Sequence, residues 1–282
     1  MLLFKKVNQL RAYLAAQRAE GKTVGFAPTM GALHAGHISL VKYSRAQNDL
    51  TVVSIFVNPT QFNEATDLEK YPRTEGSDIE KLTLAGCEVL FMPNPEEVYP
   101  SGTQSKEEFD FGGLTEVMEG AKRPGHFAGV VQVVKRLLEI VQPHRLYMGQ
   151  KDYQQFAIIQ EMLRQMQSEV RIVRCPIVRE EDGLAMSSRN VRLPADHRRR
   201  AVLLSQLLAE AKENTHRRTP AETEALAIQK MTAEPDFRPE YFIISDGRTL
   251  QPIKDWSDAD TVVACLACRV GEVRLIDNMI LK

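Results

Sequence analysis

The chain has 282 residues, 43% of them hydrophobic and 26% charged, with a formal net charge of −1 and a pI of about 6.6. This length predicts two domains, and the composition is that of an ordinary globular protein. The near-neutral charge excludes a global attraction to polyanions, so we expect neither a nucleic-acid nor a membrane partner.

The sequence has no run of about 18 consecutive apolar residues, so we expect no membrane span. Residues 1–22 read as a helix of mixed charge. They lack the basic start, apolar middle and cleavage site of a signal peptide. The sequence therefore predicts a cytoplasmic protein.

Apolar runs alternate with helical patterns through the first 178 residues. Helices are expected over 4–20, 37–47, 78–86, 127–141 and 152–166. Strands are expected over 23–29, 50–58, 87–93, 145–151 and 170–179. Because the strand segments are apolar without polar alternation, they are typical of a parallel sheet covered on both faces. Residues 1–178 are therefore expected to form a Rossmann-like, doubly wound α/β domain.

The pattern changes in residues 179–282. Helices are expected over 195–216 and 220–233, and strands over 240–246, 261–270 and 273–281. This order predicts a smaller C-terminal α+β domain, entered through the loop around residues 180–190.

Four cysteines require an interpretation, because Cys265 and Cys268 have the C-x-x-C spacing of some redox and zinc sites. Both lie within an expected strand, where residues three apart point to opposite faces. We therefore interpret them, together with Cys87 and Cys175, as buried apolar thiols of a reducing compartment.

Two histidines and two glycines lie where the strand over 23–29 should pass into a helix. His34 and His37 share one helix face, while Gly31 and Gly36 allow another group to approach the backbone. A helix N-terminus attracts phosphate, and imidazole can stabilise charge that develops during phosphoryl transfer. The stretch predicts a phosphate site. A glycine turn with two surface histidines is the alternative.

Two loops that follow later strands also carry phosphate donors. The sequence Ser187-Ser188-Arg189 predicts a pyrophosphate clamp, although such a sequence is also common in ordinary loops. In the sequence GQKD, Lys151 offers a charge to a phosphate. Asp152 could accept from a ribose hydroxyl, help to hold a metal, or only cap a helix.

Two more stretches carry polar side chains at element boundaries. Residues 122–130, KRPGHFAGV, form a cluster of basic donors that opens a helix, with a solvated basic turn as the alternative. Gln61 in NPTQF could read a hydroxyl and a carboxylate, or could belong to a simple turn. These loops carry no cysteine and no evident Ser–His–Asp arrangement. They predict nucleotidyl transfer by positioning and charge stabilisation, without a covalent enzyme intermediate.

Stretches spread over nearly the whole chain resemble the pantothenate synthetase (pantoate–β-alanine ligase) family of the nucleotidyltransferase superfamily. They are FAPTMGALHAGHISLV, SIFVNPTQF, YPRT, KRPGHFAGVVQVVKRLLEIVQP, GQKDYQQ, GLAMSSRNVRL and VRLIDN. The resemblance implies ATP-dependent ligation of (R)-pantoate and β-alanine through a pantoyl adenylate, with release of AMP and pyrophosphate. It also implies Mg²⁺ with ATP, no tightly bound organic cofactor, and a homodimer.

The resemblance also implies roles for individual residues. The implied catalytic residues are His34, His37, Lys151 and Arg189, with His37 as a proton donor. The implied ATP-binding residues are Met30, Gly31, His34, Gly36, His37, Gly149, Gln150, Lys151, Asp152, Val178, Met186, Ser187, Ser188 and Arg189. The implied substrate-binding residues are Gln61, Gln155, Arg123 and His126.

Two departures from the family pattern concern the phosphate end of this site. Gln150 stands where the family more often has Glu, and Ser77 lies in a segment that often carries an Asp near the metal. The metal ligands are therefore left unassigned.

Three alternative functions have distinct sequence signatures. Another adenylate-forming enzyme of the superfamily would lack the pantoate-specific NPTQF and KRPGHF stretches. A catalytically silent nucleotide-binding protein would have lost its phosphate donors, which are intact here. RNA binding is suggested by the basic run 198–200, but the leucines that follow it favour a solvated helix face.

Overall fold

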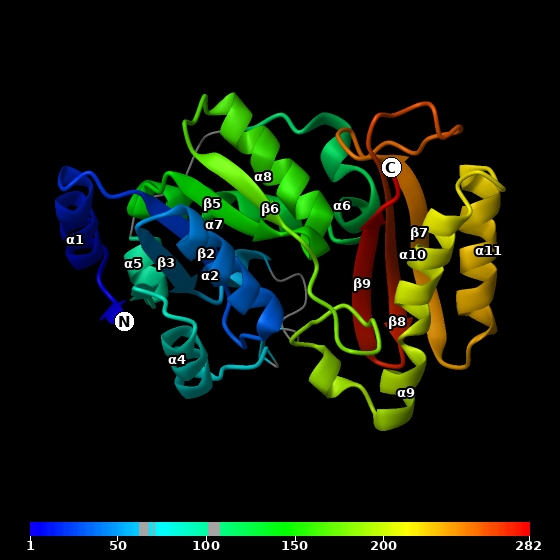
Figure 1. Ribbon diagram of the computed structural model, residues 1–282, viewed down its shortest axis with the longest axis horizontal. Coiled ribbons are helices and arrows are strands. Elements are labelled where there is room, and N and C mark those ends of the chain that lie inside the picture. The colour runs from blue at the N-terminus through cyan, green and yellow to red at the C-terminus, as the bar shows by residue number, and fades with distance from the viewer. Residues whose placement is uncertain (62–67, 70, 101–107) are drawn as a thin grey trace. The chain divides into compact units, whose positions relative to one another are not determined.

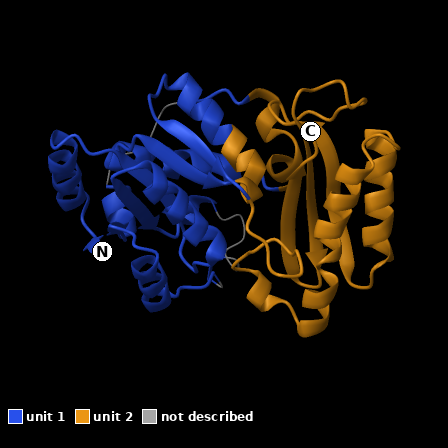
Figure 2. Ribbon diagram, in the orientation of Figure 1, with its two compact units in different colours: residues 1–111, 123–149, 158–176 blue, residues 112–122, 150–157, 177–282 orange. Residues whose placement is uncertain are grey.

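Two β-sheets organise the protein in the computed structural model, which describes residues 1–61, 68–69, 71–100 and 108–282 (Figure 1). Each sheet belongs to one compact unit (Figure 2). The first unit comprises residues 1–111, 123–149 and 158–176, and the second comprises residues 112–122, 150–157 and 177–282. Among the described residues, no helix has both the length and the apolar character needed to cross a membrane.

The first unit is built on a parallel six-stranded sheet in the order β1-β4-β3-β2-β5-β6. Its strands are β1 (Leu2–Phe4), β2 (Val24–Thr29), β3 (Leu50–Ile55), β4 (Val89–Phe91), β5 (Arg145–Gly149) and β6 (Arg171–Cys175). Every residue of β3 is buried, as expected for a parallel strand that is covered on both faces.

Helices flank this sheet. They are α1 (Val7–Ala19), α2 (Ala35–Gln47), α4 (Glu75–Leu84), α5 (Pro95–Val98) and α7 (His126–Val141), together with the later turns of α8 (Tyr153–Gln165). Leu40 of α2 and Leu82 of α4 share one apolar cluster with Val53 of β3 and Leu90 of β4. Helix α7 packs against α1 and β2. The Rossmann-like, doubly wound α/β fold expected from the sequence is confirmed.

The second unit contains an antiparallel sheet in the order β7-β8-β9. Its strands are β7 (Phe237–Asp246), β8 (Val262–Val270) and β9 (Val273–Ile280), and its helices are α6 (Met118–Lys122), α9 (Ala195–Arg200), α10 (Leu203–Glu213) and α11 (Pro220–Ala233). Leu208 of α10 and Met231 of α11 are fully buried in one cluster with Leu266 of β8. The smaller α+β region expected from the sequence is confirmed.

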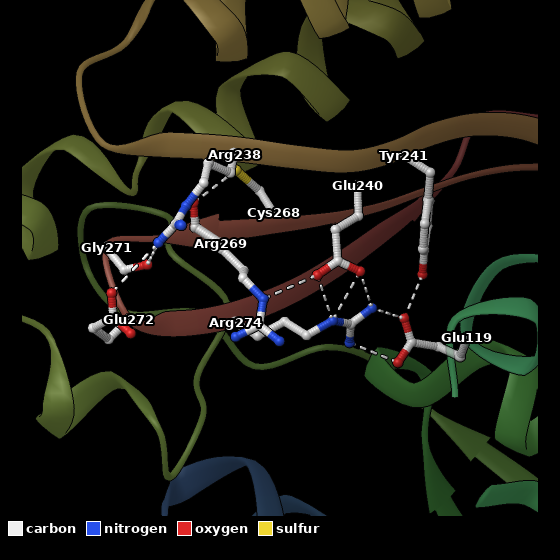
Figure 3. Close-up of polar contacts among 9 residues, drawn as sticks. All are labelled: Glu119, Arg238, Glu240, Tyr241, Cys268, Arg269, Gly271, Glu272 and Arg274. Carbon is white, nitrogen blue, oxygen red and sulfur yellow. Dashed lines mark hydrogen bonds and ion pairs between the residues drawn. The ribbon is translucent and has the colours of Figure 1, made fainter. Parts of the chain in front are cut away.

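Two segments that precede residue 178, residues 112–122 and 150–157, belong to the second unit (Figure 2). Polar side chains tie the first of these segments to the sheet of this unit (Figure 3). Glu119 of α6 accepts two hydrogen bonds from Arg274 of β9, at 2.6 and 2.7 Å, and one from the Tyr241 hydroxyl at 2.8 Å. Burial and the Glu119 carboxylate raise the pKa of Tyr241 well above its usual value. Arg274 also pairs with Glu240 at 2.9 Å.

The second early segment is linked to the first through Gln154. Its side-chain amide donates to the carbonyls of Leu114 and Val117 at 2.7 and 2.9 Å, and its carbonyl accepts from the Glu119 backbone N–H. The division at residue 178 that we expected from the sequence follows the order of the chain. The observed unit instead combines residues 112–122 and 150–157 with residues 177–282.

Two expected helices differ from those observed. The helix expected over 4–20 begins only at Val7, because residues 2–4 form β1 and pair with Val89–Phe91 of β4. The helix expected over 195–216 is two helices, α9 and α10. The backbone N–H groups of Leu204 and Ser205 bond three residues back rather than four, which tightens the turn between them.

Candidate active site

The sheet of the first unit has one point at which its strand order reverses. The chain leaves β2 toward β3 and β4 on one side, and β5 and β6 extend the sheet on the other side. The strands β2 and β5 are paired in parallel, so their carboxyl ends, Thr29 and Gly149, lie at the same edge. In open α/β sheets, ligands bind outside the strand carboxyl ends at the point where the order reverses.

Residues 30–37, here called the histidine loop, follow β2 at this point. Gly31 has a φ of +83°, and a Cβ there would press on Ile55 and Asp78, so the turn requires glycine. Asp78 of α4 is 1% exposed, and its two carboxylate oxygens accept from the backbone N–H groups of Ala32 and Leu33 at 2.9 and 2.8 Å. This buried carboxylate fixes the path of the loop.

The two histidines of the loop cap helix α2 reciprocally. Nδ1 of His34 accepts from the Gly36 backbone N–H at 3.1 Å, and Nδ1 of His37 accepts from the His34 backbone N–H at 3.3 Å. The two ring centroids are 4.1 Å apart. Two of the otherwise unpaired N–H groups of a helix start are thereby satisfied by imidazole nitrogens.

This cap decides which nitrogen carries the proton. Because Nδ1 of each ring accepts a hydrogen bond, the neutral forms of His34 and His37 carry their proton on Nε2. Both rings are then donors at the same atom. Together with the positive end of the α2 dipole, they form an arrangement suited to phosphate oxygens.

The end of β3 places Gln61 beside the same loop. The Gln61 side chain donates to Sδ of Met30 at 2.9 Å, and its Oε1 accepts from the amide of Asn58 at 3.3 Å. Asn58 in turn accepts from the Tyr99 hydroxyl, and burial raises the pKa of Tyr99 to about 12. Gln61 is therefore oriented by neighbouring side chains rather than left as part of a simple turn.

The basic stretch at the start of α7 joins this cluster. His126 bonds through Nδ1 to the Gln61 carbonyl at 2.7 Å, and its Nε2 lies 3.1 Å from Nη1 of Arg123. Gly129 also belongs here, because a Cβ would collide with the Thr60 carbonyl. The first unit thus brings together Met30, Gln61, Arg123 and His126, four residues expected in the site.

In the second unit, Gln150–Asp152 form a single 3₁₀ turn, here called the lysine turn. Asn278 of β9 donates through Nδ2 to the carbonyls of Gln150 and Lys151, at 2.9 and 2.8 Å. The Gln150 side chain returns a bond to Oδ1 of Asn278 at 3.3 Å. The turn that carries Lys151 is therefore attached to the sheet of the second unit.

A hairpin over residues 178–186 leads to Ser187–Arg189, here called the serine loop. Its two arms are joined by the backbone bond from Met186 to Val178 and by the bridge between Arg179 and Ala185. Arg179 makes a bidentate pair with Asp277, with N–O distances of 2.6 and 3.0 Å. Burial raises the pKa of Asp277, and the facing Arg179 guanidinium opposes that shift.

Within the second unit, Asp277 and Asn278 connect the base of the hairpin with the lysine turn. The expected residues Gln150, Lys151, Asp152, Val178, Met186, Ser187, Ser188 and Arg189 all belong to this unit. Gln155 lies in the first turn of α8, also in this unit.

Sequence reasoning missed four positioning residues: Asn58, Asp78, Arg179 and Asn278. Asn58 and Asn278 lay inside stretches already noted, NPTQF and VRLIDN, but their contacts depend on residues that are distant in the chain. Asp78 directly follows Ser77 and lies in the segment in which the family resemblance implies an Asp near the metal. Its two oxygens accept from the histidine loop instead.

The remaining sequence interpretations concern thiols and arginines. All four cysteines are free and buried, and burial raises the pKa of Cys87 and Cys175 to about 12, so the interpretation as apolar thiols is confirmed. In the basic run, Arg198 pairs with Asp182, while Arg199 and Arg200 pair with Asp196. These pairs reduce the positive field that RNA would require.

Together these features define an α/β protein of the Rossmann-like class, with a histidine-capped helix start at the reversal point of its parallel sheet. The model of the family Pantoate-beta-alanine ligase matches residues 2–280. The chain therefore belongs to the pantoate–β-alanine ligase family, and it is an enzyme, a ligase that forms pantothenate.

Individual relatives agree with this assignment. Pantothenate synthetase of Bacteroides fragilis (strain YCH46) is 51% identical over 279 residues, covering 99% of this chain and 98% of the relative. A crystal structure of pantothenate synthetase from Thermus thermophilus has a TM-score of 0.93 at 42% identity, covering 100% of this chain and 99% of that one.

A second solved structure contains ligands. The pantoate–β-alanine ligase from Francisella tularensis, complexed with β-γ ATP and β-alanine, has a TM-score of 0.80 at 33% identity. The match covers 100% of the present chain and 98% of the chain of the relative.

Proposed function

We propose that this ligase uses ATP to activate (R)-pantoate as pantoyl adenylate and then transfers the pantoyl group to β-alanine. The observation that carries the proposal is the pair of imidazoles whose Nδ1 atoms cap the start of α2, where the parallel sheet reverses its order. The complex of the Francisella tularensis relative with β-γ ATP and β-alanine supports ATP and β-alanine as two of these substrates.

In the first step, a carboxylate oxygen of pantoate attacks the α-phosphorus of ATP and the bond to pyrophosphate breaks. His34 and His37 donate from Nε2 to phosphate oxygens, with His37 as the proton donor. Lys151 and Arg189 offset the charge that accumulates on the leaving pyrophosphate. Ser187 and Ser188 add hydroxyl donors, and no side chain needs to act as a nucleophile.

In the second step, the amine of β-alanine attacks the acyl carbon, AMP leaves, and the nitrogen loses a proton. A free carboxylate would have to expel oxide, whereas the mixed anhydride has AMP as a good leaving group. Gln61 and Gln155 bind pantoate in this scheme, while Arg123 and His126 receive the carboxylate of the second substrate. The contact of His126 with the Gln61 carbonyl would link the two substrate sites.

The two units divide the implied ATP residues. Met30, Gly31, His34, Gly36, His37 and Gly149 belong to the first unit, which we assign to nucleotide and pantoate binding. The lysine turn and the serine loop belong to the second unit. We propose that the serine loop is the mobile phosphate-binding loop of this unit. We also propose a homodimer, which sedimentation velocity would test.

Magnesium bound with ATP would neutralise part of the triphosphate charge. The described residues contain no group of three or more His, Cys, Asp or Glu side chains that could hold a metal ion. Asp78 already accepts from two backbone N–H groups. We therefore propose that phosphate and water oxygens supply most of the ligands, as is common for this ion.

Pantoate-dependent exchange of labelled pyrophosphate into ATP, without β-alanine, tests the adenylate directly. We expect exchange with pantoate and none without it, and formation of AMP and pantothenate once β-alanine is added. Formation of ADP and phosphate instead would contradict the proposal.

His37→Ala should lower this exchange by about a hundredfold or more, because a preorganised donor to the transition state is lost. The control is His216→Ala, which removes an exposed histidine outside the candidate site. Circular dichroism checks that both variants keep their fold. Full exchange by folded His37→Ala would show that the role is wrongly assigned.

A further inference from the structure

Asn278 is a buried side chain whose whole amide is committed to the lysine turn. It is 2% exposed on β9, and both N–H bonds of Nδ2 go to consecutive backbone carbonyls, those of Gln150 and Lys151. Its Oδ1 accepts from the Gln150 side chain. Packing of β9 would not by itself require an amide here, because an apolar residue could fill the same volume.

These bonds determine how the turn presents its peptide groups. All described peptides are trans, and a trans peptide directs its N–H opposite to its C=O. The carbonyls of Gln150 and Lys151 bond to Asn278, so the N–H groups of Lys151 and Asp152 are directed away from it. An anion is attracted by N–H groups and repelled by carbonyl oxygens, so this orientation suits a phosphate ligand.

The adjacent residue of β9 performs the same task for the hairpin. Asp277, 4% exposed, receives both guanidinium nitrogens of Arg179, and the same guanidinium donates to the Gly183 carbonyl at 3.1 Å. The Asn278 backbone N–H donates to Oδ1 of Asp277 at 2.8 Å. One pair of neighbouring residues therefore holds both segments that carry phosphate donors in the second unit.

We propose that Asn278 is a positioning residue for adenylation. It sets the lysine turn in the orientation in which Lys151 and the following N–H groups meet the phosphates, and Asp277, through Arg179, sets the serine loop to match. This inference rests on the proposed function, because it assumes that Lys151 acts on ATP. Neither Asn278 nor Asp277 touches substrate in this scheme.

The test compares the two half-reactions in Asn278→Ala. We expect the rate of pantoate-dependent pyrophosphate exchange to fall by about tenfold to a hundredfold, as for a reacting group displaced by about 1 Å. Capture of supplied pantoyl adenylate by β-alanine should stay within about twofold of wild type. An equal loss of both half-reactions in folded Asn278→Ala would overturn the proposal.

A double variant shows whether Asn278 acts through Lys151. If it does, Asn278→Ala combined with Lys151→Ala should be little slower in exchange than Lys151→Ala alone, because the two changes remove one function. Multiplied effects would contradict the proposal. Asn214→Ala is the matched control, since it removes an amide that caps the Glu210 carbonyl at the end of α10; we expect its exchange rate to stay within about twofold.

Hydrogen exchange supplies a readout that does not depend on activity. Binding of a non-hydrolysable ATP analogue should protect the amides of Lys151 and Asp152 in wild type and protect them less in Asn278→Ala, while the amides of β8 keep their protection in both. Asn278→Asp keeps the side-chain size but replaces the two donors by acceptors. It should show the same split between half-reactions, which keeps the proposal decidable if the alanine variant unfolds. Wild-type protein without pyrophosphate exchange would overturn the proposed function, whereas normal exchange in both folded variants would overturn this inference alone.

Discussion

The histidine loop of the first unit and the lysine turn of the second are held in place by contacts of very different range. The end of the histidine loop that opens α2 is held from within, since His34 and His37 bond to backbone groups two and three residues away, while Asp78 holds Ala32 and Leu33 from 46 and 45 residues away. The lysine turn depends on Asn278, which lies 127 and 128 residues from its two partners. The conformation of a site segment can therefore be fixed by contacts within its own sequence or by contacts from a strand that is distant in the chain.

The largest expected effect on stability comes from ion pairs between residues that are far apart in the chain. Arg274→Met leaves Glu119 and Glu240 without their shared counter-ion, and should lower the free energy of unfolding by about 3–5 kcal/mol. Urea unfolding followed by circular dichroism measures the change. Arg238→Met is the control, because its pair with Glu272 is exposed and should contribute less than about 1 kcal/mol. Equal effects of the two changes would show that the cluster in Figure 3 does not anchor α6.

The next largest effect tests the proposed phosphate donor of the lysine turn by its effect on activity. Lys151→Ala should reduce transition-state stabilisation by about 2–4 kcal/mol, which is the range for removal of a preorganised donor. Rates of pyrophosphate exchange at saturating ATP and pantoate measure it. Lys254→Ala, which removes an exposed lysine of the second unit, is the control and should leave the rate unchanged. A wild-type rate in the Lys151 variant would show that Lys151 does not act on the phosphates.

The smallest expected effect comes from the buried carboxylate that holds the histidine loop of the first unit. Asp78→Asn exchanges one acceptor for an NH₂ group that faces a backbone N–H of the histidine loop, and should lower the free energy of unfolding by about 1–3 kcal/mol. Asp49→Asn is the matched control: Asp49 also accepts from a backbone N–H, that of Thr23, but is exposed. If both substitutions have the same effect on urea unfolding, burial of Asp78 is not what stabilises the loop.

The sequence allowed prediction of those parts of the fold that depend on near neighbours. Apolar runs revealed β2, β3, β5 and β8, because a buried strand leaves a continuous pattern. β1 was missed, because its apolar residues run directly into the helical pattern of α1 and only pairing with β4 distinguishes them from it. The assignment of Gly112–Lys122 and Gln150–Ala157 to the second unit depends on Glu119 and Gln154, whose partners no local pattern specifies.

The same limit applies to the candidate site. The spacing of His34 and His37 indicated a helix start with two imidazoles, which the structure shows. The reciprocal use of their Nδ1 atoms could not be read from spacing alone. The contact between His126 and the Gln61 carbonyl joins two stretches noted separately in the sequence, because only the folded chain brings β3 and α7 together.

The reciprocal cap at the start of α2 depends on the neutral form of both imidazole rings. An imidazolium ion has no lone pair in the ring plane on either nitrogen, so it cannot accept from a backbone N–H. Protonation of the two rings would therefore remove both side-chain acceptors from the start of α2 and place positive charge beside the same helix end. Under the proposed function the same two side chains serve both the helix start and the reaction, so a substitution of either ring would affect both.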